Sequence, residues 1–216
     1  MPFAQIQLPI TQLALNGVNG VSSAGVNNIL ASCSGTLVDL ELANMDHDSF
    51  KNDVMSMIGK CWSLETLDLA GALNLDDLAF QVAQKANEFN KQQVGLKKLV
   101  TLKLANCSKM TEATICNYLV KMAPNIEHLE LNRLTINDHG LKTVVKEFTK
   151  LRFVDFNGIK DVNYQLLDEF KKERPDLLIR QWRMKKYDKK DNELRVPWRV
   201  VEKKKKKGKK GGKKKK

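Results

Sequence analysis

The residues that most often carry out catalysis, histidine and cysteine, are few and widely spaced in this chain of 216 residues. They are His47, His128, His139, Cys33, Cys61, Cys107 and Cys116. No two histidines have HxxxH spacing and no two cysteines form CxxC, so we expect neither a zinc site nor a dithiol redox pair. The cysteines lie in apolar stretches, which favours reduced, buried thiols over a disulfide framework.

Glycine loops that bind phosphate and turns that present a nucleophile are not found either. The patterns GxGxxG, GxxxxGKS/T and GxSxG do not occur, and Gly208, Gly211 and Gly212 lie among lysines rather than after a strand. We therefore predict a protein that is not an enzyme, binds no cofactor or metal, and takes no small-molecule substrate.

The positive charge of the chain is concentrated at its C-terminus. Lysine and arginine number 37 against 25 acids, which gives a formal net charge of +12. The lysine run consists of Lys203, Lys204, Lys205, Lys206, Lys207, Lys209, Lys210, Lys213, Lys214, Lys215 and Lys216. Residues 1–181 are slightly acidic, which argues against a basic DNA-binding fold. We expect the run to be disordered and to bind RNA or ribosomes weakly, to direct nuclear import, or to act only as a solubilising end.

The segment before the lysine run, residues 182–202, mixes aromatic and basic side chains. Trp182 and Trp198 stand near arginines, a mixture that suits stacking on RNA bases. The same aromatic residues suit a segment that folds over the preceding repeat as a cap, and we favour this interpretation. The sequence thus predicts a repeat domain at 1–181, a capping or linker segment at 182–202 and a disordered tail at 203–216.

The elements that must position these residues follow a repeat. The pattern (L/I)xx(L/V)x(L/F) occurs six times, with its central apolar residue at Leu13, Leu40, Leu67, Leu102, Leu129 and Val154. Each occurrence alternates apolar and polar residues, as a short half-buried strand does, and an apolar run with helical spacing follows in five of the units. The expected N-caps of these helices are Ser22, Asp76, Thr111, Asn137 and Asn163. Stacked units of this kind predict an α/β solenoid with a curved parallel sheet inside and helices outside, in about six repeats, with a possible seventh strand near 177–179.

The repeat residues also resemble a known family. The stretch LVTLKLANCSKMTEATICNYLVKMAPNIEHL at 99–129 follows the outline LxxLxLxxCxxITDxGLxxLxxxCPxL. This outline is typical of leucine-rich repeats of the cysteine-containing, ribonuclease-inhibitor-like type, as in F-box/leucine-rich-repeat proteins. The ladder position of the outline is occupied by Met45, Ala72, Cys107, Leu134 and Ile159. The resemblance implies non-catalytic protein recognition, of the kind that supplies substrates to a ubiquitin ligase.

One part of the family pattern is not matched. Adaptors of this family carry an F-box ahead of the repeats, whereas here the first repeat begins at Ile10. We therefore expect any link to a ubiquitin ligase to need a second chain. We also expect the uncapped first repeat to belong to an isolated repeat segment, or to bind a partner through its N-terminal edge.

The strands predict a partner-binding surface. Side chains alternate across a strand, so the residues that flank each central position point away from the core. The candidates are Asp39, Glu41, Asp68, Lys103, His128, Glu130, Phe153 and Asp155. Neighbouring strands lie about 4.8 Å apart, so the acids form either a continuous patch that selects a basic segment of a protein partner, with Phe153 as an anchor, or a solvated polar face.

An insertion and the hydropathy of the chain complete the sequence-based expectations. The spacing from Leu67 to Leu102 is eight residues longer than the spacings of the neighbouring repeats, and the extra residues fall near 84–96. They predict either a longer helix with a wider loop, or a loop that contacts a partner. No apolar run is long enough to cross a membrane, and residues 1–15 lack a signal-peptide pattern. We expect an intracellular protein, cytoplasmic or nuclear, with no membrane contact.

Overall fold

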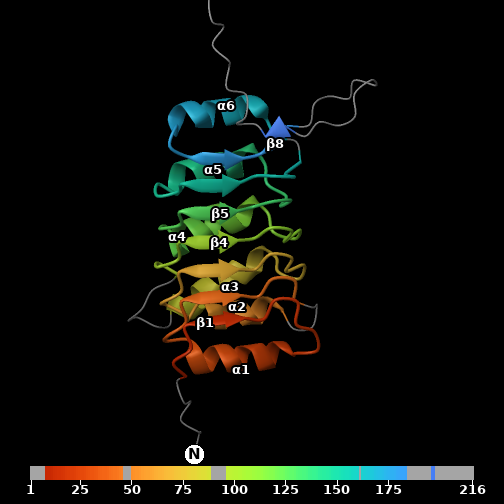
Figure 1. The fold of residues 1–216 in the computed structure, drawn as a ribbon, viewed down its shortest axis with the longest axis vertical. Helices are drawn as coiled ribbons and strands as arrows, with labels where there is room; N and C mark the ends of the chain where they lie inside the picture. Colours follow the sequence, from red (N-terminus) through yellow and green to blue (C-terminus); the bar gives the residue numbers. More distant parts are fainter. Residues whose placement is uncertain (1–7, 46–49, 89–95, 161, 184–195, 198–216) are drawn as a thin grey trace, which may run out of the picture.

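The chain forms a solenoid built on one parallel sheet of seven strands (Figure 1). The computed structural model describes residues 8–45, 50–88, 96–160, 162–183 and 196–197. The strands follow one another across the sheet in chain order. They are β1 (Gln12–Ala14), β2 (Asp39–Glu41), β3 (Thr66–Asp68), β4 (Thr101–Lys103), β5 (His128–Glu130), β6 (Phe153–Asp155) and β7 (Leu178–Arg180). The predicted leucine-rich-repeat solenoid is confirmed, and the possible seventh strand is present as β7.

The strand register is the one that the repeat spacing predicts. The central residues Leu13, Leu40, Leu67, Leu102, Leu129, Val154 and Ile179 are aligned from strand to strand. From Leu40 to Val154 these side chains are fully buried, because each lies between two neighbouring repeats. Cys107 at the ladder position is also fully buried, and its Sγ lies 3.1 Å from the carbonyl oxygen of Leu69, to which it donates.

A helix accompanies each strand of the first six repeats. The helices are α1 (Ser23–Cys33), α2 (Asn52–Ile58), α3 (Asp77–Glu88), the π-helix η1 (Thr114–Leu119) with its continuation α4 (Val120–Met122), α5 (Asp138–Glu147) and α6 (Tyr164–Glu173). The two-residue strands β8 (Trp182–Arg183) and β9 (Val196–Pro197) form a separate antiparallel pair. Figure 1 shows the repeats stacked along the long axis of the molecule, with α1 near one end and α6 near the other.

Four helix starts agree with the capping residues expected from the sequence. Ser22, Asp76, Asn137 and Asn163 directly precede α1, α3, α5 and α6, and each accepts a hydrogen bond from a backbone N–H of the first turn at 2.9–3.2 Å. Thr111 accepts one from the Ala113 N–H at 3.2 Å, but the residue directly before η1 is Ala113, which makes no side-chain capping hydrogen bond. The helix α2 was not expected from the sequence, and the residue that precedes it, Lys51, makes no side-chain capping hydrogen bond. The longest of these helices is α3, which accounts for part of the insertion after Leu67, while residues 89–95 lie outside the described residues.

A left-handed residue follows each of the first six strands and fixes the loop beside it. These residues, each four positions after the central strand residue, are Gly17, Asn44, Gly71, Asn106, Arg133 and Gly158. From Gly17 to Arg133, the backbone N–H donates to a carbonyl oxygen in the next repeat at 2.7–2.9 Å. Glycine and asparagine tolerate this conformation, whereas arginine rarely adopts it. These hydrogen bonds hold the loops in the same register as the strands and so determine where the loop side chains lie.

Candidate functional site

Two columns of side chains run along the inner face, one from each flank of the central strand residues. The first column is Gln12, Asp39, Thr66, Thr101, His128, Phe153 and Leu178. The second column is Ala14, Glu41, Asp68, Lys103, Glu130, Asp155 and Arg180. The structure therefore places all eight predicted site residues on one face and adds two more from β7. That these residues bind a partner stays a prediction.

Two of the predicted acids are structural rather than free. Asp68 and Asp155 are only 8% and 1% exposed. Lys103 Nζ lies 3.0 Å from an Asp68 carboxylate oxygen, and Arg180 Nη1 lies 3.2 Å from one of Asp155. Each carboxylate also accepts a hydrogen bond from the backbone N–H two residues later, at 3.0 and 2.9 Å. The expectation that both acids are exposed to a partner is wrong. Each carboxylate already accepts a hydrogen bond from the backbone of the turn that follows it and forms an ion pair with a cation on the next strand.

The other acids on this face are more accessible and differ in their contacts. Asp39 accepts a hydrogen bond from Gln12 Nε2 at 2.8 Å, and Glu41 accepts one from Asn16 Nδ2 at 2.6 Å. The Glu130 carboxylate makes no hydrogen bond or ion pair within the described part of the chain. We conclude that Glu130 is the inner-face acid best placed to pair with an external cation.

The neighbours of Glu130 shape its protonation. Partial burial raises the pKa of Glu130 most strongly, and the charges of Asp155 and Asp68 raise it further, while Lys103 and Arg180 oppose the shift. The pKa of Lys103 is also raised, chiefly by its hydrogen bond to Asp68. A cation from a partner would therefore stabilise a carboxylate that the protein itself leaves poorly compensated.

The first column changes from polar to apolar along the solenoid. Its N-terminal members are glutamine, aspartate and threonines, and its C-terminal members are His128, Phe153 and Leu178. The ring centroids of His128 and Phe153 lie 6.1 Å apart. Leu178, at 42%, is among the large hydrophobic side chains that remain exposed. Phe153, on the strand next to that of Glu130, and Leu178, one strand further on, therefore form an apolar strip that the His128 ring extends.

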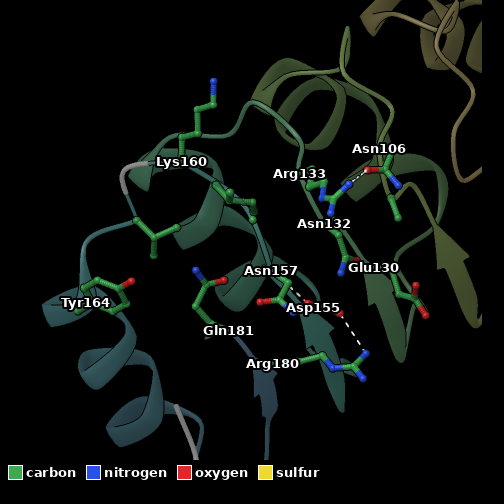
Figure 2. Close-up of a pocket in the computed structure, with 14 residues that line it drawn as sticks. Asn106, Glu130, Asn132, Arg133, Asp155, Asn157, Lys160, Tyr164, Arg180 and Gln181 are labelled. Atoms are coloured by element: carbon green, nitrogen blue, oxygen red, sulfur yellow. Dashed lines mark hydrogen bonds and ion pairs between the residues drawn. The ribbon is translucent and has the colours of Figure 1, made fainter. Parts of the chain in front are cut away.

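A hollow of about 970 Å³ adjoins this strip at the loops that follow β5 and β6 (Figure 2). Glu130, Asp155 and Arg180 form its strand side, and its loop side is made mainly by Asn106, Asn132, Arg133, Asn157, Lys160, Tyr164 and Gln181. Figure 2 shows Arg133 turned toward Asn106 and Arg180 turned toward Asp155. The hollow thus presents amides together with charges of both signs.

Two buried side-chain carbonyl oxygens in this hollow have no hydrogen-bond partner among the described residues. They are Oδ1 of Asn132 and Oε1 of Gln181, and the Gln181 residue is only 5% exposed. A buried polar atom without a partner costs about 1–3 kcal/mol. A bound molecule that donates N–H or O–H groups here would supply the partner that the described residues do not.

Most residues that line the hollow are not among those expected from the sequence. The amides and Arg133 lie in loops, where alternation along a strand says nothing about direction. One signal was available: Asn132 and Asn157 each stand three residues after a central strand position, so the repeat places them side by side. Leu178 and Arg180 flank the central residue of β7, so the alternation rule would have found them once that strand was included.

The cysteines have the environment of packing residues. Cys33, Cys61 and Cys107 are fully buried. Burial raises the pKa of Cys61 and of Cys107 to about 12, so both remain thiols at neutral pH. Cys116 is half-buried, with its Sγ 3.4 Å from Thr143 Oγ1. No group of three potential metal-ligating side chains occurs among the described residues, and none of their helices is long and apolar enough to span a membrane.

The C-terminal predictions lie mostly beyond the described part of the chain. The lysines of 203–216 are outside it, as are His47 and Trp198. The backbone of β8 and β9 is described, so a short hairpin-like pairing follows β7. Whether 182–202 forms a cap, and whether the lysines bind polyanions, stay predictions.

Comparisons with known proteins give likeness of fold alone. No family model matches the sequence, and no curated protein sequence matches it. Among solved structures, the chain is similar to internalin C2 from Listeria monocytogenes, with 19% identity and a TM-score of 0.46, over 79% of this chain and 70% of that one. It is also similar to a chain of the yeast Rad7 and Elc1 complex, with 15% identity and a TM-score of 0.41, over 72% of this chain and 52% of that one. The repeat fold itself is established by the register of the seven strands.

Proposed function

We propose that the protein is a recognition module that binds another protein with the C-terminal half of its inner face. One observation carries the proposal: Glu130, whose carboxylate has no hydrogen bond or ion pair within the described chain, lies between the apolar strip and the hollow. The site therefore offers a carboxylate for a cation, an apolar strip for an apolar side chain, and acceptor oxygens for N–H donors, all in one place. Recognition sites combine an apolar anchor with a few polar contacts in this way.

The chemistry of the site indicates what the partner carries. A lysine or arginine would pair with Glu130, and an apolar side chain would cover Phe153 and Leu178. Main-chain or side-chain N–H groups would donate to the free oxygens of Gln181 and Asn132. A basic, partly apolar segment in extended conformation offers all three, because a peptide presents an N–H at each residue other than proline.

A finer form of the proposal is that this recognition serves ubiquitin ligation. Its support is the repeat sequence at 99–129, which resembles the repeats of F-box/leucine-rich-repeat adaptors. In that role the protein would select a substrate inside the cell and another chain would connect it to the ligase. The runner-up function is RNA or ribosome association through 182–216, and its support is the density of lysine, arginine and tryptophan in that segment.

Quantitative affinity purification with point variants tests the proposal. The full chain would be used as bait against nuclease-treated native lysate, with Glu130→Lys and Phe153→Ala as site variants. Glu169→Lys, at an exposed position on α6, makes the same charge change away from the inner face and serves as the matched control.

Proteins that bind wild type and Glu169→Lys but are depleted at least tenfold with both site variants would support the inner-face site. A crosslink from such a protein to the loops at 132–133 or 157–160 would support the hollow. Capture that depends on RNA or on residues 203–216, and is unaffected by Glu130→Lys, would refute the proposal in favour of the polyanion-binding function.

A further inference from the structure

We propose that two copies of this chain associate head to head through the free edge of β1, joining their sheets into one. The first observation is the distribution of charge. Charged residues make up 29% of the chain, yet the first charged side chain is Asp39, so the whole first repeat is uncharged. An exposed solenoid end normally carries a polar cap, and exposed edge strands are normally protected by charges. The first repeat has the composition of a surface that is covered.

The second observation is that β1 is an edge strand with pairing groups to spare. Among the described residues β1 pairs with β2 alone. The Thr11 carbonyl accepts from the backbone N–H groups of Val38 and Asp39, and the Leu15 N–H donates to Glu41, so these groups face β2. Backbone groups alternate in direction along a strand. The N–H and C=O groups of Gln12 and Ala14 therefore point to the open edge, where another strand can pair with them.

The third observation is that the core is incompletely covered at this end. Ile10, Leu13, Leu15, Val18 and Val21 are only partly buried, although they pack against the core. In the second repeat, the residues at the positions equivalent to the first four are 0–6% exposed; these are Leu37, Leu40, Leu42 and Met45. The same repeat positions are thus sealed where a neighbouring repeat covers them and open where none does. A partner at the β1 edge would bury this apolar end.

Charge favours a second copy of the chain as the occupant. An antiparallel pairing of β1 with its own copy is self-complementary, as a two-fold interface requires, and places only uncharged side chains opposite one another. The lysine-rich C-terminus follows β7, at the opposite end of the sheet from β1. Head-to-head association therefore joins the two uncharged ends of the sheet. Head-to-tail association would instead place β7, with its half-exposed Arg180, at every junction.

Measurement of molar mass tests the inference directly. Light scattering coupled to size exclusion, and sedimentation velocity, would be run on the full chain without added terminal residues, from low micromolar to several hundred micromolar protein. We expect a concentration-dependent rise to twice the 24.5 kDa of one chain. The rise should be unchanged in high salt and on removal of 203–216, because the interface carries no charge. The mass of one chain at every concentration would overturn the proposal, as would growth beyond two chains.

A variant pair locates the interface. Gln12→Lys combined with Ala14→Lys adds positive charge to exposed positions on the edge strand and should weaken self-association at least tenfold. Thr101→Lys adds a lysine to the same column on the central strand β4 and should leave self-association unchanged. Circular dichroism would establish that each variant is folded. If the edge variant does not fold, the single variants Gln12→Cys and Ala14→Cys would be mixed and oxidised. A disulfide between the two copies would then show that their β1 strands lie side by side. A folded edge variant that dimerises like wild type, or no crosslink between copies, would overturn the assignment to β1.

Discussion

Replacing Asp155 with alanine tests whether this acid stabilises the fold, in contrast to Glu130, whose carboxylate we expect to be available to a partner. The Asp155 carboxylate is 1% exposed and accepts a backbone hydrogen bond from Asn157 at 2.9 Å and a second hydrogen bond from Arg180 at 3.2 Å. Hydrogen bonds to a charged group contribute about 1.5–3 kcal/mol each. The Arg180 side chain is 58% exposed, so water solvates its guanidinium when the Asp155 carboxylate is removed. The ion pair therefore contributes about 1 kcal/mol or less to the free energy of unfolding.

Together these contacts predict a loss of about 2–4 kcal/mol in the free energy of unfolding for Asp155→Ala. In a domain of this size each kcal/mol lowers Tm by roughly 2–4 °C. Asp155→Asn keeps an acceptor for the Asn157 N–H and should lose about half as much. Glu130→Ala, one strand away in the same column, should cost less than about 0.5 kcal/mol, because its carboxylate makes no such contact.

Urea unfolding followed by circular dichroism measures these differences. Asp168→Ala on the exposed surface of α6 is the control for loss of an acid and should match wild type. If Asp155→Ala unfolds at the same urea concentration as Glu130→Ala, the carboxylate of Asp155 is not held in the fold. That acid would then be as available to a partner as simple strand alternation supposes.

Three further predictions concern the core, the tail and the dependence on pH. Leu102→Ala should cost about 2–5 kcal/mol, because it empties a fully buried site between two repeats, and a loss under about 1 kcal/mol in urea unfolding would contradict the strand register. Deletion of 203–216 should leave Tm within a few degrees while lowering retention on a heparin column, and equal retention would remove the electrostatic role of the tail. Burial raises the pKa of Asp77, but hydrogen bonds from Thr114 and Thr111 outweigh it and hold that pKa below its ordinary value. A carboxylate whose pKa is lowered by folding stabilises the protein at neutral pH, and this stabilisation is lost as the pH falls through the folded-state pKa. The Tm of Asp77→Asn should therefore fall less on acidification than the Tm of wild type. If Tm falls equally with pH in both proteins, the hydrogen bonds to Asp77 do not stabilise the fold.

The fold could be predicted from the sequence because one alternation rule was repeated. Each strand needs an apolar residue at its centre and at its neighbours two positions away, and six stretches with this pattern define the sheet, its register and the side that is buried. Helix starts could be predicted where a side chain provides the cap. The helix α2 was missed because Lys51 gives no such signal.

The candidate site could be predicted only in part, because alternation gives the direction of a side chain and not its partners. Whether an acid on the inner face is free depends on which residue the next repeat places beside it, about 25 to 35 residues away in the sequence. Lys103 pairs with Asp68 and Arg180 pairs with Asp155, while no cation in the described part of the chain forms an ion pair with Glu130. A count of acids therefore overstates the charge that this face offers to a partner.

The same neighbour dependence gives the two halves of the inner face different capacities. In the N-terminal half, the accessible acids Asp39 and Glu41 already accept hydrogen bonds from Gln12 and Asn16, and the side chains around them are small or polar. A cation that docks there must displace those donors, and exposed ion pairs of this kind contribute about 1 kcal/mol or less. In the C-terminal half, Glu130 is partly desolvated and adjoins both Phe153 and a hollow with unsatisfied acceptors. Because desolvated contacts beside an apolar anchor contribute most to binding, selectivity for a partner should reside in the C-terminal half even though the acids extend over both.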